Sequence, residues 1–320
     1  MNNRRSFLQR LGLLTAGVAF APSLLTSCEA AGRKTETAAG ATAEAAGAEN
    51  PTSAKAEIKD IGIQLYTMRQ LLPKDVKGVI ARVAQAGYND VETYGYAPDS
   101  GYWKLSPKAF REVLDANNLT SSSGHYEFGQ YMKDGNTDVV KRYIEAGKAV
   151  GQTYITVPWL DAEVRTKLDD YKRIANLMNV AAQLCQDAGL KLAYHNHDFE
   201  FQKYGNTTGY EVLLQETDPG LVSFEADLYW VVRAGLKPVD LFRQHQGRFV
   251  MWHVKDMNKQ APELNTEVGS GSINYQEIFR QAKLSGVERI FVEQENFAAA
   301  MDPYKSIRQS RDYVKNTLLA

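Results

Sequence analysis

The chain has 320 residues, of which 44% are hydrophobic and 23% are charged. This composition excludes collagen-like, coiled-coil and wholly disordered proteins. Its 37 Lys and Arg residues nearly balance 38 Asp and Glu residues, and without a basic excess to neutralise phosphates we expect no nucleic-acid partner. The two cysteines, Cys28 and Cys185, are too few for a disulfide framework, so stability must come from an ordinary core.

Residues 1–27 predict an export signal that ends in a lipobox. Arg4 and Arg5 precede an apolar run over residues 11–21, which is typical of twin-arginine export. That run is shorter than the roughly 20 residues of a membrane-spanning helix. Residues 25–28, Leu-Thr-Ser-Cys, resemble the bacterial lipoprotein box, in which the cysteine becomes the acylated N-terminus. We therefore expect membrane attachment through a lipid on Cys28; an ordinary signal with an incidental cysteine is the alternative.

Residues 28–57 contain mainly Ala, Gly, Thr and Glu without apolar periodicity. Such a segment buries too little apolar surface to offset the entropy of ordering, which predicts a disordered linker. With the preceding signal, it predicts an exported protein that is periplasmic or lipid-anchored at the outer membrane.

From residue 58 to residue 320, short apolar runs alternate with segments of helical periodicity. The helical segments include residues 76–86, 107–117, 139–150 and 171–188, and glycines such as Gly151 and Gly286 follow where a helix C-cap is expected. Eight strand–helix units predict a single α/β domain, a (β/α)8 TIM barrel. A doubly wound open sheet fits less well, because no Gly-rich phosphate turn follows the first strand. The eight predicted strands are 61–66, 90–94, 119–123, 154–157, 192–195, 222–227, 249–253 and 289–293.

Side chains that can bind a metal gather at the predicted strand ends, which line the active site of a TIM barrel. Converging carboxylates repel one another unless a cation or protons offset their charge, so a divalent metal is the simplest explanation. Mixed imidazole and carboxylate ligands favour Zn, Mn, Co or Fe(II) over Ca. The histidines are His125, His195, His197 and His253, and the carboxylates are Glu92, Glu200, Asp227, Glu293 and Glu295.

Strand alternation groups several of these residues in pairs. Residues two apart in a strand share a face, so each such strand presents a ligand and a second polar group toward the barrel axis. The pairs are His195 with His197, His253 with Lys255, and Glu293 with Glu295.

These residues lie in motifs that resemble the sugar phosphate isomerase/epimerase family, the xylose isomerase-like TIM barrels. The resemblance covers residues from about 58 to 320, and its motifs are residues 62–69, 194–201, 252–256 and 292–296. It implies one divalent metal, Zn, Mn or Co, held by side chains from strands five to eight. Asp227, His253 and Glu293 match the last three ligands. At the fifth strand many relatives have Glu, and here the ligand is His195 or Glu200.

The resemblance also implies isomerisation or epimerisation of a sugar by proton transfer beside a carbonyl, through a metal-stabilised enediolate. Glu293 and either Glu200 or His195 would be the acid and base, and Lys255 and His197 would bind hydroxyls or stabilise the oxyanion. A free carbohydrate fits export better than a sugar phosphate, although the loop 269–272, Gly-Ser-Gly-Ser, could hold a small anion. The expected substrate-binding residues are Trp230, His125, Glu92 and Glu295.

Three other functions remain open on the sequence. The same enolisation would make the protein a lyase, either a dehydratase or a keto-glycoside-cleaving enzyme, if the substrate carries a leaving group. A lipoprotein that binds sugar without catalysis is a weaker alternative, because it does not explain the cluster of ligands. An endonuclease is weaker still, because the chain lacks a basic excess. Cys185 lies among apolar residues of a predicted helix and is expected to be an inert core thiol.

Overall fold

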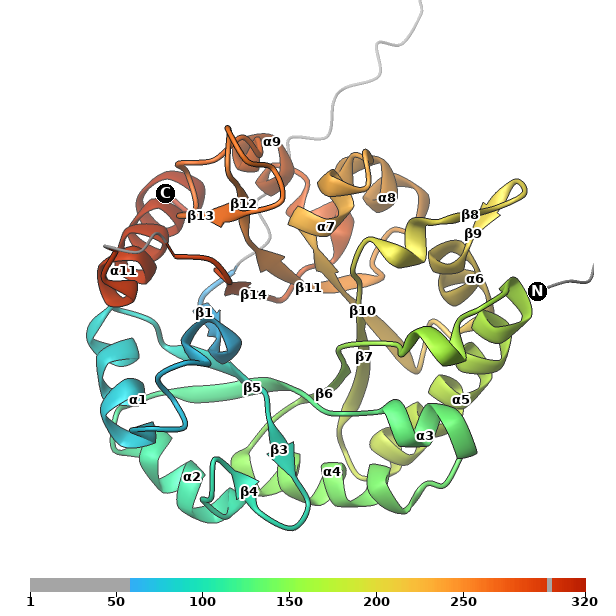
Figure 1. The fold of residues 1–320 in the computed structure, drawn as a ribbon, viewed down its shortest axis with the longest axis horizontal. Coiled ribbons are helices and arrows are strands. Elements are labelled where there is room, and N and C mark those ends of the chain that lie inside the picture. The colour runs from blue at the N-terminus through green and yellow to red at the C-terminus, as the bar shows by residue number, and fades with distance from the viewer. Residues whose placement is uncertain (1–57, 298–300) are drawn as a thin grey trace, which may run out of the picture. The chain divides into compact units, whose positions relative to one another are not determined.

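The computed structural model describes residues 58–297 and 301–320. Eight parallel strands close into a barrel in the order β1-β14-β11-β10-β7-β6-β5-β2 and lie inside a ring of helices (Figure 1). The predicted TIM barrel is therefore confirmed, and the open-sheet alternative is excluded. The barrel strands are β1 (Ile61–Gln64), β2 (Asp90–Thr93), β5 (Thr120–His125), β6 (Tyr154–Val157), β7 (Lys191–His195), β10 (Val222–Asp227), β11 (Phe249–Val254) and β14 (Arg289–Val292).

The helices follow the strands, and several of them begin at a side chain that caps their free N–H groups. Asp75 accepts a hydrogen bond from the Gly78 N–H at the start of α1, and Ser106 caps α2 in the same way. Gly151 ends α4 with φ of 90°, a conformation that favours glycine. The α-helices are α1 (Val76–Gln85), α2 (Pro107–Asp115), α3 (Gly129–Asp134), α4 (Asp138–Val150), α5 (Leu168–Asp187), α6 (Gly209–Glu216), α7 (Leu228–Arg233), α8 (Pro238–Gln244), α9 (Tyr275–Phe279), α10 (Ala282–Ser285) and α11 (Pro303–Tyr313).

The loops after the strands carry short elements of their own, and these surround the mouth of the barrel. Two are 3-10 turns: η1 (Leu65–Met68) directly follows β1, and η3 (Phe199–Phe201) lies in the loop after β7. Three are small antiparallel hairpins, β3 (Tyr96–Ala97) with β4 (Gly101–Tyr102), β8 (Lys203–Tyr204) with β9 (Thr207–Thr208), and β12 (Asp256–Met257) with β13 (Asn265–Thr266). The remaining short elements are η2 (Ala162–Val164) and the π-helical η4 (Val314–Leu318).

An apolar layer closes the interior of the barrel below its mouth. Tyr154, Ala193, Met251 and Phe291 form one buried cluster from β6, β7, β11 and β14. A side chain on Gly62 would clash with the Phe291 ring, so this glycine makes room for the layer. Two residues further along β7, β11 and β14, on the same face, the side chains become polar. The apolar layer keeps water from the inner side of that polar layer, and this strengthens electrostatic interactions there.

A larger apolar core lies between the strands and the helices. It includes Cys185 of α5, whose thiol is buried. Burial raises the pKa of this thiol to about 12, so the reactive thiolate is scarce at neutral pH. Within the described residues, no helix is both long and apolar enough to cross a bilayer. The predicted export signal, the lipobox at Cys28 and the linker lie outside the described residues.

Candidate functional site

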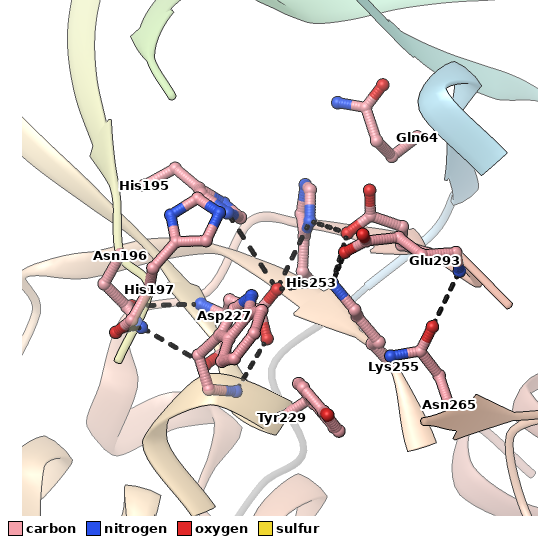
Figure 2. A network of polar contacts seen from close by, with 12 residues as sticks. Gln64, His195, Asn196, His197, Asp227, Tyr229, His253, Lys255, Asn265 and Glu293 are labelled. Atoms are coloured by element: carbon pink, nitrogen blue, oxygen red, sulfur yellow. Dashed lines mark hydrogen bonds and ion pairs between the residues drawn. The ribbon is translucent and has the colours of Figure 1, made fainter. Parts of the chain in front are cut away.

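The ends of four neighbouring strands bring His195, Asp227, His253 and Glu293 together (Figure 2). His195 Nε2 and His253 Nδ1 each lie 3.9 Å from Asp227 Oδ2. His253 Nδ1 is also 3.1 Å from Glu293 Oε2. All four side chains are buried. The structure therefore assembles the four side chains that the sequence proposed as metal ligands, with His195 at the fifth-strand position.

The donor set of this cluster fits a divalent metal. Candidate ligand atoms of Asp227, His253 and Glu293 lie within 4.8 Å of one another. Asp227 Oδ1 accepts a hydrogen bond from the Trp230 N–H, whereas Oδ2 is buried and has no hydrogen-bond partner among the described residues. A buried carboxylate oxygen without a partner is costly unless a cation or proton meets it. Burial raises the pKa of Asp227 to about 6, against the nearby charges of Lys255 and His253.

A second layer of carboxylates lies behind the two histidines. Glu225 Oε2 is 3.0 Å from His195 Nδ1 and 2.8 Å from His125 Nε2. Glu92 Oε2 is 2.6 Å from His253 Nε2. A carboxylate that accepts one ring N–H fixes the tautomer, so the other nitrogen, here the one that faces Asp227, is free to bind a metal. The site contains this arrangement twice, as Glu225 with His195 and as Glu92 with His253.

Glu225 also belongs to a second group with metal-binding potential, formed with His125, His195 and His253. This group shares His253 with the group of Asp227, His253 and Glu293, and the two carboxylate sets face opposite nitrogens of that ring. In the deeper group the histidines already pair with Glu225 and Glu92. Burial opposes protonation of His125, but these two carboxylates raise its pKa to about 9. The imidazolium of His125 thus offsets negative charge behind the cluster.

Lys255 provides the cation on the opposite side of the cluster. Its Nζ is 3.2 Å from Glu293 Oε2 and 3.6 Å from Asp227 Oδ2, and it pairs with Glu295. Burial opposes its charge, but Glu293, Asp227 and Glu295 raise the pKa of Lys255 above its ordinary value. Lys255 therefore stays an ammonium beside the candidate metal ligands, as its predicted role requires.

His197 lies one step nearer the solvent than His195. Its ring contacts Trp159 and Trp230 at centroid distances of 4.8 and 5.5 Å, and its Nδ1 has no hydrogen-bond partner among the described residues. Burial, with Lys255 nearby, lowers the pKa of His197 to about 3. His197 is therefore neutral at physiological pH and suits hydrogen bonding to a substrate hydroxyl better than proton storage.

A cavity of about 400 Å³ opens from the cluster to the solvent. Three of the four predicted substrate-binding residues line it, namely Trp230, His125 and Glu295. Glu92 does not line this cavity, contrary to its predicted role in substrate binding: it is fully buried and hydrogen-bonded to Gln64, Ser123 and His253. Aromatic side chains that also line the cavity are Tyr66, Tyr94 and Trp159.

Glu200, the alternative fifth-strand ligand, lies apart from the cluster. Its Oε1 accepts a hydrogen bond of 2.6 Å from the Tyr194 hydroxyl, and its Oε2 accepts one from the His197 N–H. Tyr194 alternates with His195 along β7 and packs in the core between strands and helices. Glu200 is thus on the outer side of the strand, so the structure brings His195 to the cluster and Glu200 elsewhere.

The loop after β12 and β13 has its backbone N–H groups already engaged. The carboxylate of Asp256 accepts hydrogen bonds from the N–H groups of Gly269, Gly271 and Ile273 at 2.9 to 3.1 Å. The small-anion site considered for residues 269–272 is therefore filled by a side chain of the protein itself.

Two residues of the site were not predicted, Glu225 and Gln64. Glu225 stands two residues before Asp227 in β10 and shares its face, so the alternation applied to the other strands would have found it. Gln64 ends β1 and donates to Glu92 from 2.7 Å, but a single amide at a strand end gives no comparable signal.

Comparison with known proteins agrees with this geometry. Residues 80–317 match the family model of the xylose isomerase-like TIM barrel. The chain belongs to this family. A curated relative, inosose dehydratase of Clostridium botulinum, is 25% identical over 193 residues, which cover 53% of this chain and 62% of the relative. A second inosose dehydratase, from Geobacillus kaustophilus, is 28% identical over 45% of this chain and 52% of its own length. The chain thus spans less than two thirds of the length of each of these relatives.

Solved structures are similar to this chain over more than four fifths of its length. A sugar phosphate isomerase/epimerase of Parabacteroides distasonis has a TM-score of 0.72 and 28% identity, over 83% of this chain and 96% of its own. D-allulose 3-epimerase of a Methylomonas species has a TM-score of 0.62 and 13% identity, over 82% and 99%, and shows the shared fold. The similar proteins are enzymes by name, and this family member has residues that can hold a metal ion.

Proposed function

We propose that the protein is a divalent-metal-dependent sugar isomerase or epimerase that moves a proton beside a carbonyl. The observation that carries the proposal is the buried Oδ2 of Asp227, which has no hydrogen-bond partner among the described residues and faces His195 Nε2, His253 Nδ1 and Lys255 Nζ. Because this cluster adjoins a cavity of about 400 Å³, a small carbohydrate can reach it.

The four residues His195, Asp227, His253 and Glu293 would hold the metal, with Zn, Mn or Co as the candidates. When bound there, a divalent cation supplies Lewis acidity toward a carbonyl and the adjacent hydroxyl. Glu225 and Glu92 orient the two histidines from behind.

Proton transfer falls to the carboxylates that line the cavity. Although burial opposes it, Lys255 and His253 hold the pKa of Glu293 below its ordinary value, so this group is ionised and able to accept a proton. Lys255 stabilises the oxygen that becomes negative as the proton leaves. His197, through its unpaired Nδ1, and Glu295 bind substrate hydroxyls, and the Trp230 ring forms part of the wall.

Metal analysis of the purified full chain, followed by proton exchange, tests this function. We expect about one equivalent of Zn, Mn or Co, and deuterium uptake from D2O beside the carbonyl of keto-sugars. His253→Ala should lose both properties. His245→Ala is the matched control, because His245 ends α8 away from the cluster and should keep both. A chain that binds no divalent metal under any loading condition contradicts the proposal and favours a binding protein.

A lyase is the second candidate, and the inosose dehydratase relatives favour it. The first proton transfer would be the same, but a leaving group on the next carbon would then depart instead of a proton returning. Analysis of products by NMR separates the two: an isomer or epimer supports the first function, and an unsaturated or cleaved product supports the lyase.

We also propose that the protein is exported and attached to a membrane by a lipid on Cys28, with the barrel in the periplasm or at the outer membrane. The support is the order of Arg4 and Arg5, the apolar run and Cys28 along the chain. Fractionation of cells that express the full chain tests it. Cys28→Ala should move the protein from the membrane fraction to the soluble one, and unchanged membrane association would contradict the lipid anchor.

A further inference from the structure

The rim of the cavity carries aromatic side chains beyond those beside the metal ligands. Within the described residues, Tyr66 and Trp159 are the aromatic members of the exposed large hydrophobic set, at 39% and 43% exposure. Both line the cavity that contains His195 and Glu293. Tyr66 follows β1 and Trp159 follows β6, so they approach the cavity from different sides of the barrel. Exposed apolar surface concentrated at a pocket marks a binding surface.

Trp159 lies further from the candidate metal ligands than Trp230 does. The Trp230 ring borders the cluster, with Lys255 Nζ 5.4 Å from its centroid. The His197 ring lies between the two tryptophans, 5.5 Å from Trp230 and 4.8 Å from Trp159. The aromatic wall therefore continues from the candidate metal ligands toward solvent for two successive ring contacts.

The position of Trp159 is fixed before any ligand arrives. Its ring packs at 78° against Phe199 with centroids 4.9 Å apart, and the Arg165 guanidinium lies 5.8 Å from it. Arg165 is itself held by a hydrogen bond to the Leu160 carbonyl and by the Phe199 ring. A rigid aromatic side chain loses little conformational entropy when a ligand stacks on it.

The charge around the cavity limits what can stack there. The acidic side chains of Glu127, Asp198 and Glu295 line it, and Lys255 beside it is buried and paired with carboxylates. The Arg69 and Arg165 guanidinium groups face the rings of Tyr66 and Trp159, so they offset part of this negative charge at the rim. A neutral ring with many hydroxyls is favoured, because its C–H face can pack on an aromatic ring while its hydroxyls donate to the carboxylates.

We infer that the ligand of this cavity is a saccharide of at least two rings, with one ring at the Asp227 and Glu293 cluster and the next ring stacked on Trp159. For the sugar ring at the cluster, the inference rests on the proposed function. The site for the second sugar ring depends only on Trp159 and its neighbours.

Calorimetric titration of the metal-loaded full chain tests the inference, with maltose, cellobiose, trehalose and lactose as probes beside glucose and galactose. We expect at least one disaccharide to bind more tightly than its constituent sugars. Trp159→Ala should weaken that binding about 10-fold, which corresponds to about 1.4 kcal/mol, and leave monosaccharide binding unchanged. Trp159→Phe should retain most of the affinity. Leu264→Ala is the matched control, because Leu264 is also exposed and apolar but does not line the cavity.

Two results would overturn the inference. One is a panel in which no disaccharide binds more tightly than its parts. The other is an equal loss of affinity for monosaccharides and disaccharides in Trp159→Ala, which would place Trp159 against the sugar ring at the cluster. The metal and deuterium measurements report on the proposed function separately. A chain without proton exchange but with a Trp159-dependent preference for disaccharides would therefore refute that function and keep the outer site.

Discussion

Two buried glutamates, Glu225 and Glu200, show how the two sides of one barrel wall differ. Both are fully buried, and burial raises the pKa of each above its ordinary value. Glu225 lies inside the barrel, where its Oε2 contacts the rings of His125 and His195. Glu200 lies on the outer side, where the Tyr194 hydroxyl and a backbone N–H satisfy it. Burial and a raised pKa are thus common to both carboxylates, and only their partners distinguish them.

Asp227→Asn should have the largest effect, because it removes the carboxylate oxygen that faces three nitrogens of the inner cluster. We expect metal affinity to fall by more than about 100-fold, the upper range for loss of residues that only support ligands. Competitive chelator titration measures the affinity, and circular dichroism checks that the barrel remains folded. Retention of metal with wild-type affinity would move the binding site to the deeper group of His125, His195, Glu225 and His253.

Glu225→Gln should have an intermediate effect. Glutamine keeps the shape but cannot fix the His195 tautomer as a carboxylate does, so we expect metal affinity to fall by about 10- to 100-fold. The same chelator titration measures it. A fall in metal affinity as large as in Asp227→Asn would indicate that Glu225 is itself a metal ligand. Unchanged metal affinity would show that Glu225 does not contribute to the metal site.

The fold and much of the inner cluster were predictable from the sequence, because both depend on short-range periodicity. Each predicted strand overlaps a barrel strand, and alternation along β7, β11 and β14 placed His195, His253 and Glu293 toward the axis. Glu225 was missed only because the same rule was not applied within β10.

Other features depend on contacts that no local pattern contains. The chain leaves β7 after His195, so the side on which Glu200 lies is decided by the distant packing of its loop against Tyr194. Glu92 was correctly placed at the end of a strand, but its position behind His253 rather than in the cavity depends on the register between strands. The sequence of the loop at Gly269 is compatible with an anion site, but in the structure the Asp256 carboxylate occupies its N–H groups.

Glu200→Gln should have the smallest effect on the metal and a distinct effect on stability. We expect metal affinity within about 2-fold of wild type, because Glu200 does not reach the cluster. Burial raises the pKa of Glu200 from 4.5 to about 7, so between these values the folded chain binds more protons than the unfolded chain. Its contribution to the free energy of unfolding is therefore fully present below pH 4.5 and is lost as the pH rises through 7.

Denaturant unfolding at several pH values measures this contribution. From pH 4.5 to 7 the wild type should lose up to about 3 kcal/mol more stability than Glu200→Gln, whose side chain cannot ionise. If the free energy of unfolding of the two proteins changes with pH in parallel, the Tyr194 hydroxyl and the His197 N–H hold Glu200 ionised at low pH. Together with unchanged metal affinity, the expected divergence would separate the structural carboxylate outside the barrel from the functional one inside it.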